Sequence, residues 1–237
     1  MGATGDLGGR VAVAAAARGA RVVPAGRDPE RLAALVRRLG APGAERFDAY
    51  RLDTCAGLAA RAAERLGGLD AVLVTVGVAA FGPADLARPE IEEHLAAVNA
   101  LAPIAVLRGA LGVVGPGAAV GAVTGVVVAR PLAGAGAYRA SKAALTAWLE
   151  TARLEQRRRR VAVLEARPPH LANGFAGRAV AGNPPPLPAG ADPQSWAEAA
   201  LDALLDGAAL VRPGPDGRPV REPGRPRVRA EAGPGAS

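Results

Sequence analysis

Short runs of β-branched and other apolar residues alternate along the chain with longer stretches rich in Ala, Leu and Arg that have a helical period. The short runs predict strands over residues 20–25, 46–52, 71–76, 118–123, 161–166 and 208–211. The longer stretches predict helices over residues 7–18, 29–39, 57–66, 91–111, 137–156 and 193–205. This alternation predicts a Rossmann-like, doubly wound α/β fold, in which helices cover both faces of a parallel sheet.

A glycine-rich loop at the start of the chain leads directly into the first predicted helix. Glycine in such a loop lets the backbone approach a pyrophosphate, and the helix N-terminus stabilises the negative charge. Taken alone, the pattern is equally compatible with a flexible terminus. The candidate cofactor-binding residues of this loop are Gly2, Thr4, Gly5, Leu7 and Gly8.

A buried strand normally precedes a loop of this kind, but here the loop begins at Gly2. We therefore expect the sheet to lack its first strand. We also expect the natural start of the protein to lie upstream of Met1, by one strand of about 5 or 6 residues plus a few more.

The residue after the second strand of a dinucleotide-binding fold selects the cofactor. An acidic residue there holds the ribose 2′-hydroxyl of NAD, whereas an arginine accommodates the 2′-phosphate of NADP. Gly26 and Arg27 follow the predicted strand over residues 20–25, which favours NADP over NAD. Asp28 is the competing candidate, but its position before Pro29 is typical of a helix cap.

The 237 residues, of which 50% are hydrophobic, suffice for one continuous core, which we assign to a single domain over residues 1–211. The formal charge of +7 comes from two stretches, residues 157–160 and a tail rich in Pro, Gly and Arg over residues 212–237. The first lies at a predicted helix end, and the second has the composition of a disordered segment. We therefore expect a disordered tail and no nucleic-acid partner.

A single cysteine permits no internal disulfide, and no apolar run approaches the roughly 20 residues that span a bilayer. These observations predict a cytoplasmic protein without a membrane partner. The two histidines, His94 and His170, lie outside any cluster of Cys or carboxylates, so we expect no metal site.

The segment over residues 170–190 has no clear period and contains three consecutive prolines. Long irregular segments in compact domains are often binding loops, so we interpret this one as a substrate loop or lid; the alternative is a passive connector. Its low polarity favours an apolar or lipid-like substrate.

Tyr138 and Lys142 are four residues apart in a predicted helix, so their side chains lie on one face. Of the 29 basic residues, 28 are arginines, and Lys142 is the only lysine. An ammonium is a compact charge that a planar guanidinium does not readily replace. Beside a tyrosine it favours the phenolate and lowers the pKa of the phenol toward the working range. We interpret the pair as catalytic; the alternative is an unrelated pair on a helix surface.

With these residues the chain resembles the short-chain dehydrogenase/reductase family over essentially its whole length, through the N-terminal loop and residues 98–101, 138–142 and 167–170. The resemblance implies that Tyr138 is the acid/base and that Lys142 holds the nicotinamide ribose. It also implies that Asn99 is a kink residue that anchors a proton-relay water and that Asp53 contacts the adenine. Pro168 would begin the segment that turns over the nicotinamide.

Several positions depart from the family pattern. Asp6 replaces a glycine of the phosphate loop, and the motif Asn-Asn-Ala-Gly is reduced to Val-Thr-Val-Gly, which ends at Gly77, a further cofactor-binding candidate. Gly125 stands where the family has its catalytic serine. The adjacent Thr124 could offer its hydroxyl to the substrate oxygen instead.

These residues predict an NADP-dependent carbonyl reductase or alcohol dehydrogenase that acts on a small-molecule carbonyl or alcohol substrate. The alternative is a dinucleotide-binding sensor or scaffold of the same fold that has lost turnover. The resemblance implies a homodimer or homotetramer formed through the helix of Tyr138 and its neighbour.

Overall fold

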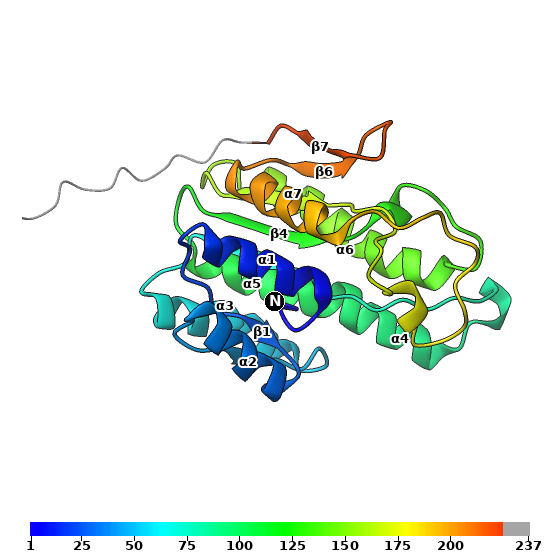
Figure 1. The fold of residues 1–237 in the computed structure, drawn as a ribbon, viewed down its shortest axis with the longest axis horizontal. Helices are drawn as coiled ribbons and strands as arrows, with labels where there is room; N and C mark the ends of the chain where they lie inside the picture. Colours follow the sequence, from blue (N-terminus) through cyan, green and yellow to red (C-terminus); the bar gives the residue numbers. More distant parts are fainter. Residues whose placement is uncertain (225–237) are drawn as a thin grey trace, which may run out of the picture.

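Helices cover both faces of a central sheet in the computed structural model, which describes residues 1–224 (Figure 1). The helices are α1 (Asp6–Ala17), α2 (Pro29–Leu39), α3 (Leu52–Leu66), α4 (Pro89–Ala96), α5 (Ala102–Val113), α6 (Gly136–Glu155) and α7 (Pro193–Leu205). On one face α1 packs against α7, and on the other α3 packs against α5 with α6 beside it.

The strands are β1 (Ala25–Gly26), β2 (Glu45–Arg46), β3 (Ala71–Val74), β4 (Ala119–Val123), β5 (Ala162–Ala166), β6 (Leu210–Pro213) and β7 (Pro219–Glu222). The main sheet has the order β3-β4-β5-β6-β7, and β1 and β2 form a separate parallel pair. Strands β3 to β6 are parallel, whereas β7 runs antiparallel to β6. The expected doubly wound α/β fold is confirmed.

A gap separates the two sheets where the first strand is expected, and residues 1–3 lie in it. The Met1 amino group donates to the Leu73 carbonyl at 2.8 Å, and the Met1 carbonyl accepts from the Thr75 N–H at 2.9 Å. On the other side, the N–H groups of the next two residues both donate to the Ala25 carbonyl, at 2.8 and 3.0 Å. Three residues therefore join the two sheets, and no strand precedes α1 among the described residues.

This gap explains why two predicted strands are shorter than expected. The strand over residues 20–25 is reduced to β1, and the strand over residues 46–52 is reduced to β2. A segment forms a strand only where a neighbour accepts and donates backbone hydrogen bonds along its length. In the described part of the chain, β1 pairs with β2 at two positions only.

The Asp28 cap expected from the sequence is confirmed, and α7 starts in the same way. The Asp28 carboxylate accepts hydrogen bonds from two N–H groups of the first turn of α2, each at 3.0 Å. Asp192 does the same for α7, at 3.2 and 2.8 Å. Both helices have proline in the first helical position, where its missing N–H costs nothing.

The predicted helix over residues 91–111 is continuous but wider in its middle. It consists of α4, the five-residue π-helix η2 (Ala97–Leu101) and α5. The whole stretch Pro89–Val113 is long and apolar enough to cross a membrane by length and composition, with a mean hydropathy of 1.6 and half of its most apolar window buried in the protein. A core helix passes the same test, and α5 packs against α3, β3 and β4.

The domain boundary expected at residue 211 is wrong, because the chain continues as an ordered hairpin. β6 extends to Pro213, and β7 pairs with it from Pro219 to Glu222. The Arg212 and Glu222 side chains form an ion pair across this hairpin, and Arg221 pairs with Asp206 at the end of α7. The remainder of the expected tail, residues 225–237, lies outside the described residues.

Candidate active site

A cleft of about 1410 Å³ opens at the carboxyl ends of β1, β3, β4 and β5. This edge is where doubly wound sheets bind their ligands. The candidates that line the cleft are Thr4, Gly5, Leu7, Gly8, Arg27, Gly77, Thr124, Tyr138, Lys142 and Pro168. Three other candidates, Gly2, Asp53 and Asn99, do not line it.

The glycines of the N-terminal loop stand where a side chain would not fit. A Cβ atom on Gly8 would lie 2.3 Å from the Gly2 carbonyl oxygen, and Gly2 itself has a φ of +89°. A Cβ on Gly26 would lie 2.6 Å from the Thr4 side chain. Gly2 therefore supports the loop on the side away from the cleft. Residues 4–8 line the cleft at the N-terminus of α1, where backbone N–H groups favour an anionic ligand.

Asp6 stands where the family pattern of this loop has a glycine, and its carboxylate forms an ion pair. Its carboxylate lies 3.0 Å from Arg10 Nε, one turn further along α1. Both side chains are partly exposed, which leaves the pair in solvent at the edge of the cleft. The pairing reduces the repulsion that a free carboxylate would exert on a pyrophosphate.

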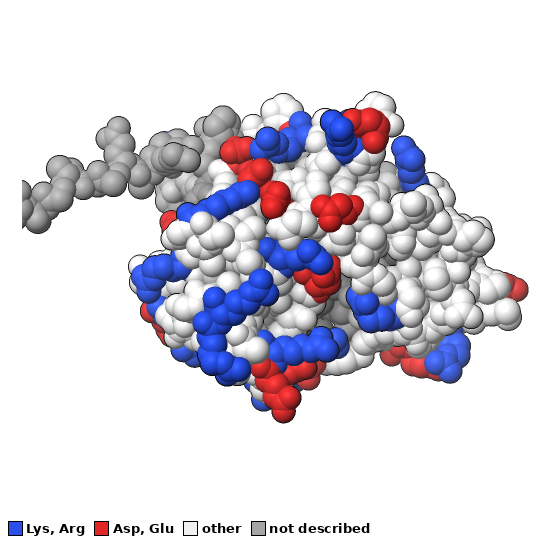
Figure 2. Space-filling view, in the orientation of Figure 1, with Lys and Arg blue, Asp and Glu red and all other residues white. Residues whose placement is uncertain are grey.

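Arg27 follows β1 directly and lines the cleft together with Arg31. Arg31 Nε lies 3.4 Å from the Asp28 carboxylate, whereas no ion pair of Arg27 occurs among the described residues. Basic side chains gather over the region of α1 and α2 in Figure 2. Asp28 caps α2, as the sequence predicts, so its carboxylate is committed to backbone N–H groups.

The structure places Asp53 away from the cleft, which corrects the expected adenine contact. Because α3 begins at Leu52, Asp53 lies in the first turn of a helix rather than at a strand end. Its side chain is 69% exposed and pairs with Arg51 at 3.3 Å, and this partner lowers the pKa of the carboxyl. Asp48, which follows β2 by two residues, is the acidic residue at the carboxyl edge of the sheet.

Lys142 is anchored between the ends of two parallel strands. Its ammonium donates to the Val76 carbonyl at 3.1 Å and to the Val123 carbonyl at 3.2 Å, which leaves one of its three N–H groups for a ligand in the cleft. The side chain is 3% exposed, and burial lowers its pKa to about 8. A Cβ on Gly77 would lie 2.8 Å from the Lys142 Nζ, so this position must be glycine for the lysine to reach its place.

Tyr138 lies one turn before Lys142 on α6, and its ring packs near two phenylalanines. The ring centroids of Phe81 and Phe175 are 6.5 and 6.2 Å from that of Tyr138. Burial in this apolar setting raises the pKa of Tyr138 above its ordinary value. The expectation that Lys142 lowers this pKa is therefore wrong for this structure, because loss of hydration around the phenolate is the dominant influence. Tyr138 is protonated at neutral pH and suited to donate a proton.

Asn99 lies in the π-helical turn, as expected of a kink residue, but its side chain is fully used inside the protein. The carboxamide exchanges two hydrogen bonds of 2.9 Å with the backbone of Val78 and donates a third to Ser141 Oγ, also at 2.9 Å. Asn99 is completely buried. It fixes the segment after β3 against helix α6. Ser141 in turn donates to the Tyr138 carbonyl, so it is a structural link and not a nucleophile.

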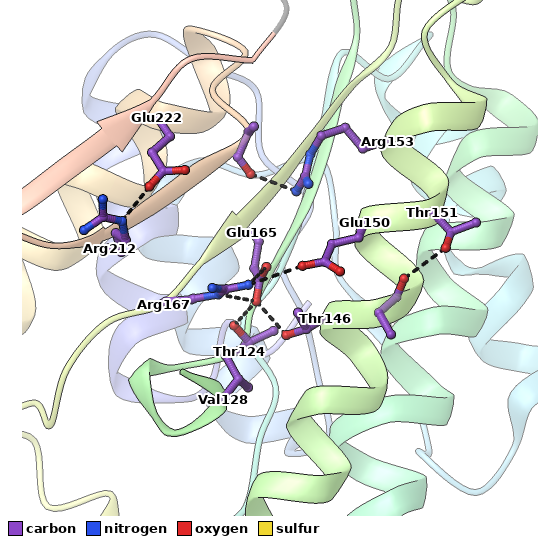
Figure 3. Close-up of polar contacts among 12 residues, drawn as sticks. Thr124, Val128, Thr146, Glu150, Thr151, Arg153, Glu165, Arg167, Arg212 and Glu222 are labelled. Carbon is purple, nitrogen blue, oxygen red and sulfur yellow. Dashed lines mark hydrogen bonds and ion pairs between the residues drawn. The ribbon is translucent and has the colours of Figure 1, made fainter. Parts of the chain in front are cut away.

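The Thr124 hydroxyl points into a buried polar cluster, so it does not take the predicted role of donating to the substrate oxygen. It donates to a carboxylate oxygen of Glu165 at 2.7 Å, and Thr146 of α6 donates to the same oxygen at 2.7 Å (Figure 3). Arg167 binds this carboxylate through two hydrogen bonds of 2.9 and 2.8 Å. A hydroxyl has one proton, so Thr124 cannot polarise a substrate oxygen while it donates to Glu165.

Glu165 is a buried residue beneath the cleft that the sequence did not predict to belong to the site. It is 1% exposed, and its three hydrogen-bonding partners hold its pKa below the ordinary value despite burial. An acidic residue within an otherwise apolar run, Val-Leu-Glu-Ala, was the available signal, since buried carboxylates need partners.

Gly125 leaves the expected serine position without a side chain. Its φ of +115° lies in a region that L-residues rarely adopt. The next residue, Val126, donates its N–H to the Pro168 carbonyl at 2.9 Å. This bond joins the loops after β4 and β5 at the floor of the cleft.

The segment over residues 170–190 covers one end of the cleft and is fastened at several points. At its base, Ala172 N–H donates to the Ala191 carbonyl at 2.9 Å. Further along, Val180 N–H donates to the Ala79 carbonyl at 2.8 Å. The segment is thus a wall of the cleft, and its interpretation as a substrate loop stays a prediction. Its cleft-facing residues include His170, Leu171, Asn173, Phe175, Ala176, Arg178, Val180 and Leu187.

Among the described residues no group of three or more His, Cys, Asp or Glu could hold a metal ion. The His94 imidazole contacts the Tyr50 hydroxyl at 2.6 Å on the surface.

The geometry can be compared with known proteins. A family model described as short chain dehydrogenase matches residues 1–181 of the chain. A protein described as a putative short-chain oxidoreductase from Thermus thermophilus is 30% identical, with a TM-score of 0.73 over 86% of this chain and 93% of that one. No curated protein sequence matches the chain.

Two further structures share the fold at lower identity. An alcohol dehydrogenase from Thermococcus sibiricus, complexed with 5-hydroxy-NADP, is 23% identical with a TM-score of 0.74 over 86% of this chain and 87% of that one. A short chain dehydrogenase/reductase from Burkholderia phymatum, in complex with NAD, is 20% identical with a TM-score of 0.78 over 88% of this chain and 85% of that one. At these identities the likeness concerns the fold alone.

Proposed function

Because the chain belongs to the short chain dehydrogenase family, we propose that it is an NADP-dependent oxidoreductase that interconverts a small-molecule carbonyl and the corresponding alcohol. The observation that carries this proposal is the arrangement of Tyr138 and Lys142 in one cleft. A protonated phenol and an ammonium with one free N–H line the same cavity, at the carboxyl ends of the strands.

The residues of the cleft fit a nicotinamide dinucleotide. Gly8 and Gly77 line the cleft without side chains, and a Cβ on either would meet the protein's own atoms. The α1 N-terminus suits a pyrophosphate, and the remaining Lys142 N–H suits a ribose hydroxyl. When bound, the nicotinamide would supply or accept the hydride. Arg27, which has no ion pair in the described part of the chain, supports a preference for the 2′-phosphate of NADP.

Tyr138 supplies the proton in the direction of reduction. The substrate oxygen gains negative charge as the carbonyl carbon accepts hydride, and the Tyr138 O–H donates its proton to that oxygen. Lys142 provides the positive charge near the site, and Asn99 fixes the segment that carries Gly77. No second hydroxyl donor is assigned, because Thr124 is bound to Glu165.

Replacement of Tyr138 by phenylalanine tests the function. We expect Tyr138→Phe to lower turnover of a carbonyl panel with NADPH by a factor of at least about 10² while leaving the NADPH Kd within about twofold, because only the proton donor is removed. The readouts are NADPH oxidation, followed by its absorbance, and fluorescence titration. Equal turnover by the variant would remove Tyr138 from the mechanism.

The second candidate function is a dinucleotide sensor or scaffold without turnover. Gly125 at the serine position and the inward Thr124 hydroxyl favour it. The two functions differ in one measurement: NADPH binding together with no hydride transfer to a broad carbonyl panel supports the sensor. Assembly as a dimer or tetramer and a cytoplasmic location stay predictions.

A further inference from the structure

The reacting end of the cleft gathers aromatic side chains in a chain that has very few. Aromatic residues make up 3% of the sequence, and it has three phenylalanines. Two of them, Phe81 and Phe175, line the cleft beside Tyr138, although they come from segments far apart in the sequence. The third, Phe47, is buried in the core and does not line the cleft.

Phe81 is held in place by its backbone. Its N–H donates to the Ala181 carbonyl at 2.9 Å, and the N–H of the following residue donates to the Gly134 carbonyl at 2.8 Å. Gly182 packs so closely that a Cβ there would lie 1.8 Å from the Phe81 carbonyl oxygen. These contacts fix the backbone that carries the Phe81 ring.

Phe175 is held by a turn that involves the side chains of Asn173 and Arg178 in the same wall. The Asn173 side-chain oxygen accepts the Phe175 N–H at 3.1 Å, and the Asn173 carbonyl accepts from Arg178 Nη1 at 2.9 Å. The amide oxygen and the guanidinium thus build the turn that presents the ring. Leu132, Val180 and Leu187 add apolar surface to this end of the cleft.

From this wall we infer the substrate class of the proposed reaction: a carbonyl compound with an aromatic ring next to the carbonyl group. The inference rests on the proposed function. Fixed aromatic rings pack best against a flat π-system, edge to face or offset, and each such pair adds about two- to tenfold in binding beyond area burial. A ring beside the carbonyl places the carbonyl oxygen at Tyr138, because the three rings share one corner of the cleft.

Two ketones of equal connectivity separate ring planarity from bulk. With NADPH, we expect kcat/KM for acetophenone to exceed that for cyclohexyl methyl ketone by about tenfold. Phe81→Leu and Phe175→Leu should each reduce this ratio about threefold or more, since leucine keeps apolar bulk and removes the π-face. Phe47→Leu makes the same change outside the cleft, and its ratio should equal that of the unmodified protein.

A ratio near one, or a preference for 2-decanone, would overturn the inference in favour of a lipid-like substrate. A second experiment compares the two ketones by binding. Calorimetry measures the affinity of the Tyr138→Phe variant for acetophenone and for cyclohexyl methyl ketone in the presence of NADP. Tighter acetophenone binding there supports the inference even if no carbonyl is turned over, so the two proposals fail separately. Equal affinities, or no binding of either ketone, would contradict it.

Discussion

At the scale of single residues, burial controls the charge of the two groups proposed for the chemistry. Burial removes hydration from both Lys142 and Tyr138. In each case the pKa shifts in the direction that stabilises the neutral form relative to the charged form. For the phenol this strengthens its hold on the proton. For the ammonium it lowers the pKa to about 8.

The lowered lysine pKa predicts an alkaline limit on activity. Lys142 is charged below its pKa of about 8 and loses its charge as the pH rises through that value, so kcat/KM with NADPH should fall about tenfold per pH unit above it. Lys142→Arg keeps a charge at every accessible pH, so the activity that it retains should lack this fall. An unchanged alkaline limb in the arginine variant would assign the titration to another group.

At the scale of elements, one carboxylate ties the ends of β4 and β5 to helix α6. Glu165 of β5 accepts hydrogen bonds from Thr124 after β4 and from Thr146 on α6 (Figure 3). Arg167 completes the cluster and also lies 3.7 Å from the exposed Glu150. The floor of the cleft and the helix of Tyr138 therefore depend on the same buried anion.

Removal of this anion should be costly. We expect Glu165→Ala to lower the free energy of unfolding by about 3 kcal/mol or more, because a guanidinium and two hydroxyls lose their buried acceptor. Glu150→Ala removes the exposed partner of the same arginine and should cost less than about 1 kcal/mol. Urea unfolding of both variants measures the difference. Similar losses for the two would show that the buried contacts of Glu165 contribute little.

At the scale of the whole molecule, the cleft is built from two sheets that residues 1–3 join. Arg27 stands on the β1 side, and Lys142 reaches the ends of β3 and β4 on the other. A dinucleotide that lies along the cleft would contact both sides. Its binding would therefore stabilise their arrangement by mass action.

The cofactor preference can be measured through this coupling. We expect Arg27→Ala to weaken NADPH binding about tenfold and to reduce the rise in Tm caused by NADPH, with little change for NADH, because only the 2′-phosphate loses a partner. Arg37→Ala, on α2 outside the cleft, is the matched control. Equal effects on both cofactors would place Arg27 outside the 2′-phosphate site.

The local chemistry of the chain could be predicted because it depends on neighbours in sequence. Helix periods, the Asp28 cap and the placement of Tyr138 and Lys142 on one face of α6 follow from spacings of about three to five residues, which secondary structure converts directly into geometry. The predicted adenine contact of Asp53 is wrong because α3 starts at Leu52, earlier than predicted. This start places Asp53 in the first turn of a helix and not at a strand end.

The sequence by itself determined the α/β order, the glycine loop and the one lysine of the cleft. Only the tertiary structure decided what surrounds them. The partner of the Thr124 hydroxyl is Glu165, 41 residues away, and the ring of Tyr138 meets Phe81 and Phe175 from two other loops. Such contacts depend on which strands lie side by side, and the desolvation that raises the Tyr138 pKa depends on them too. Neither these contacts nor this desolvation can be predicted from a local sequence pattern.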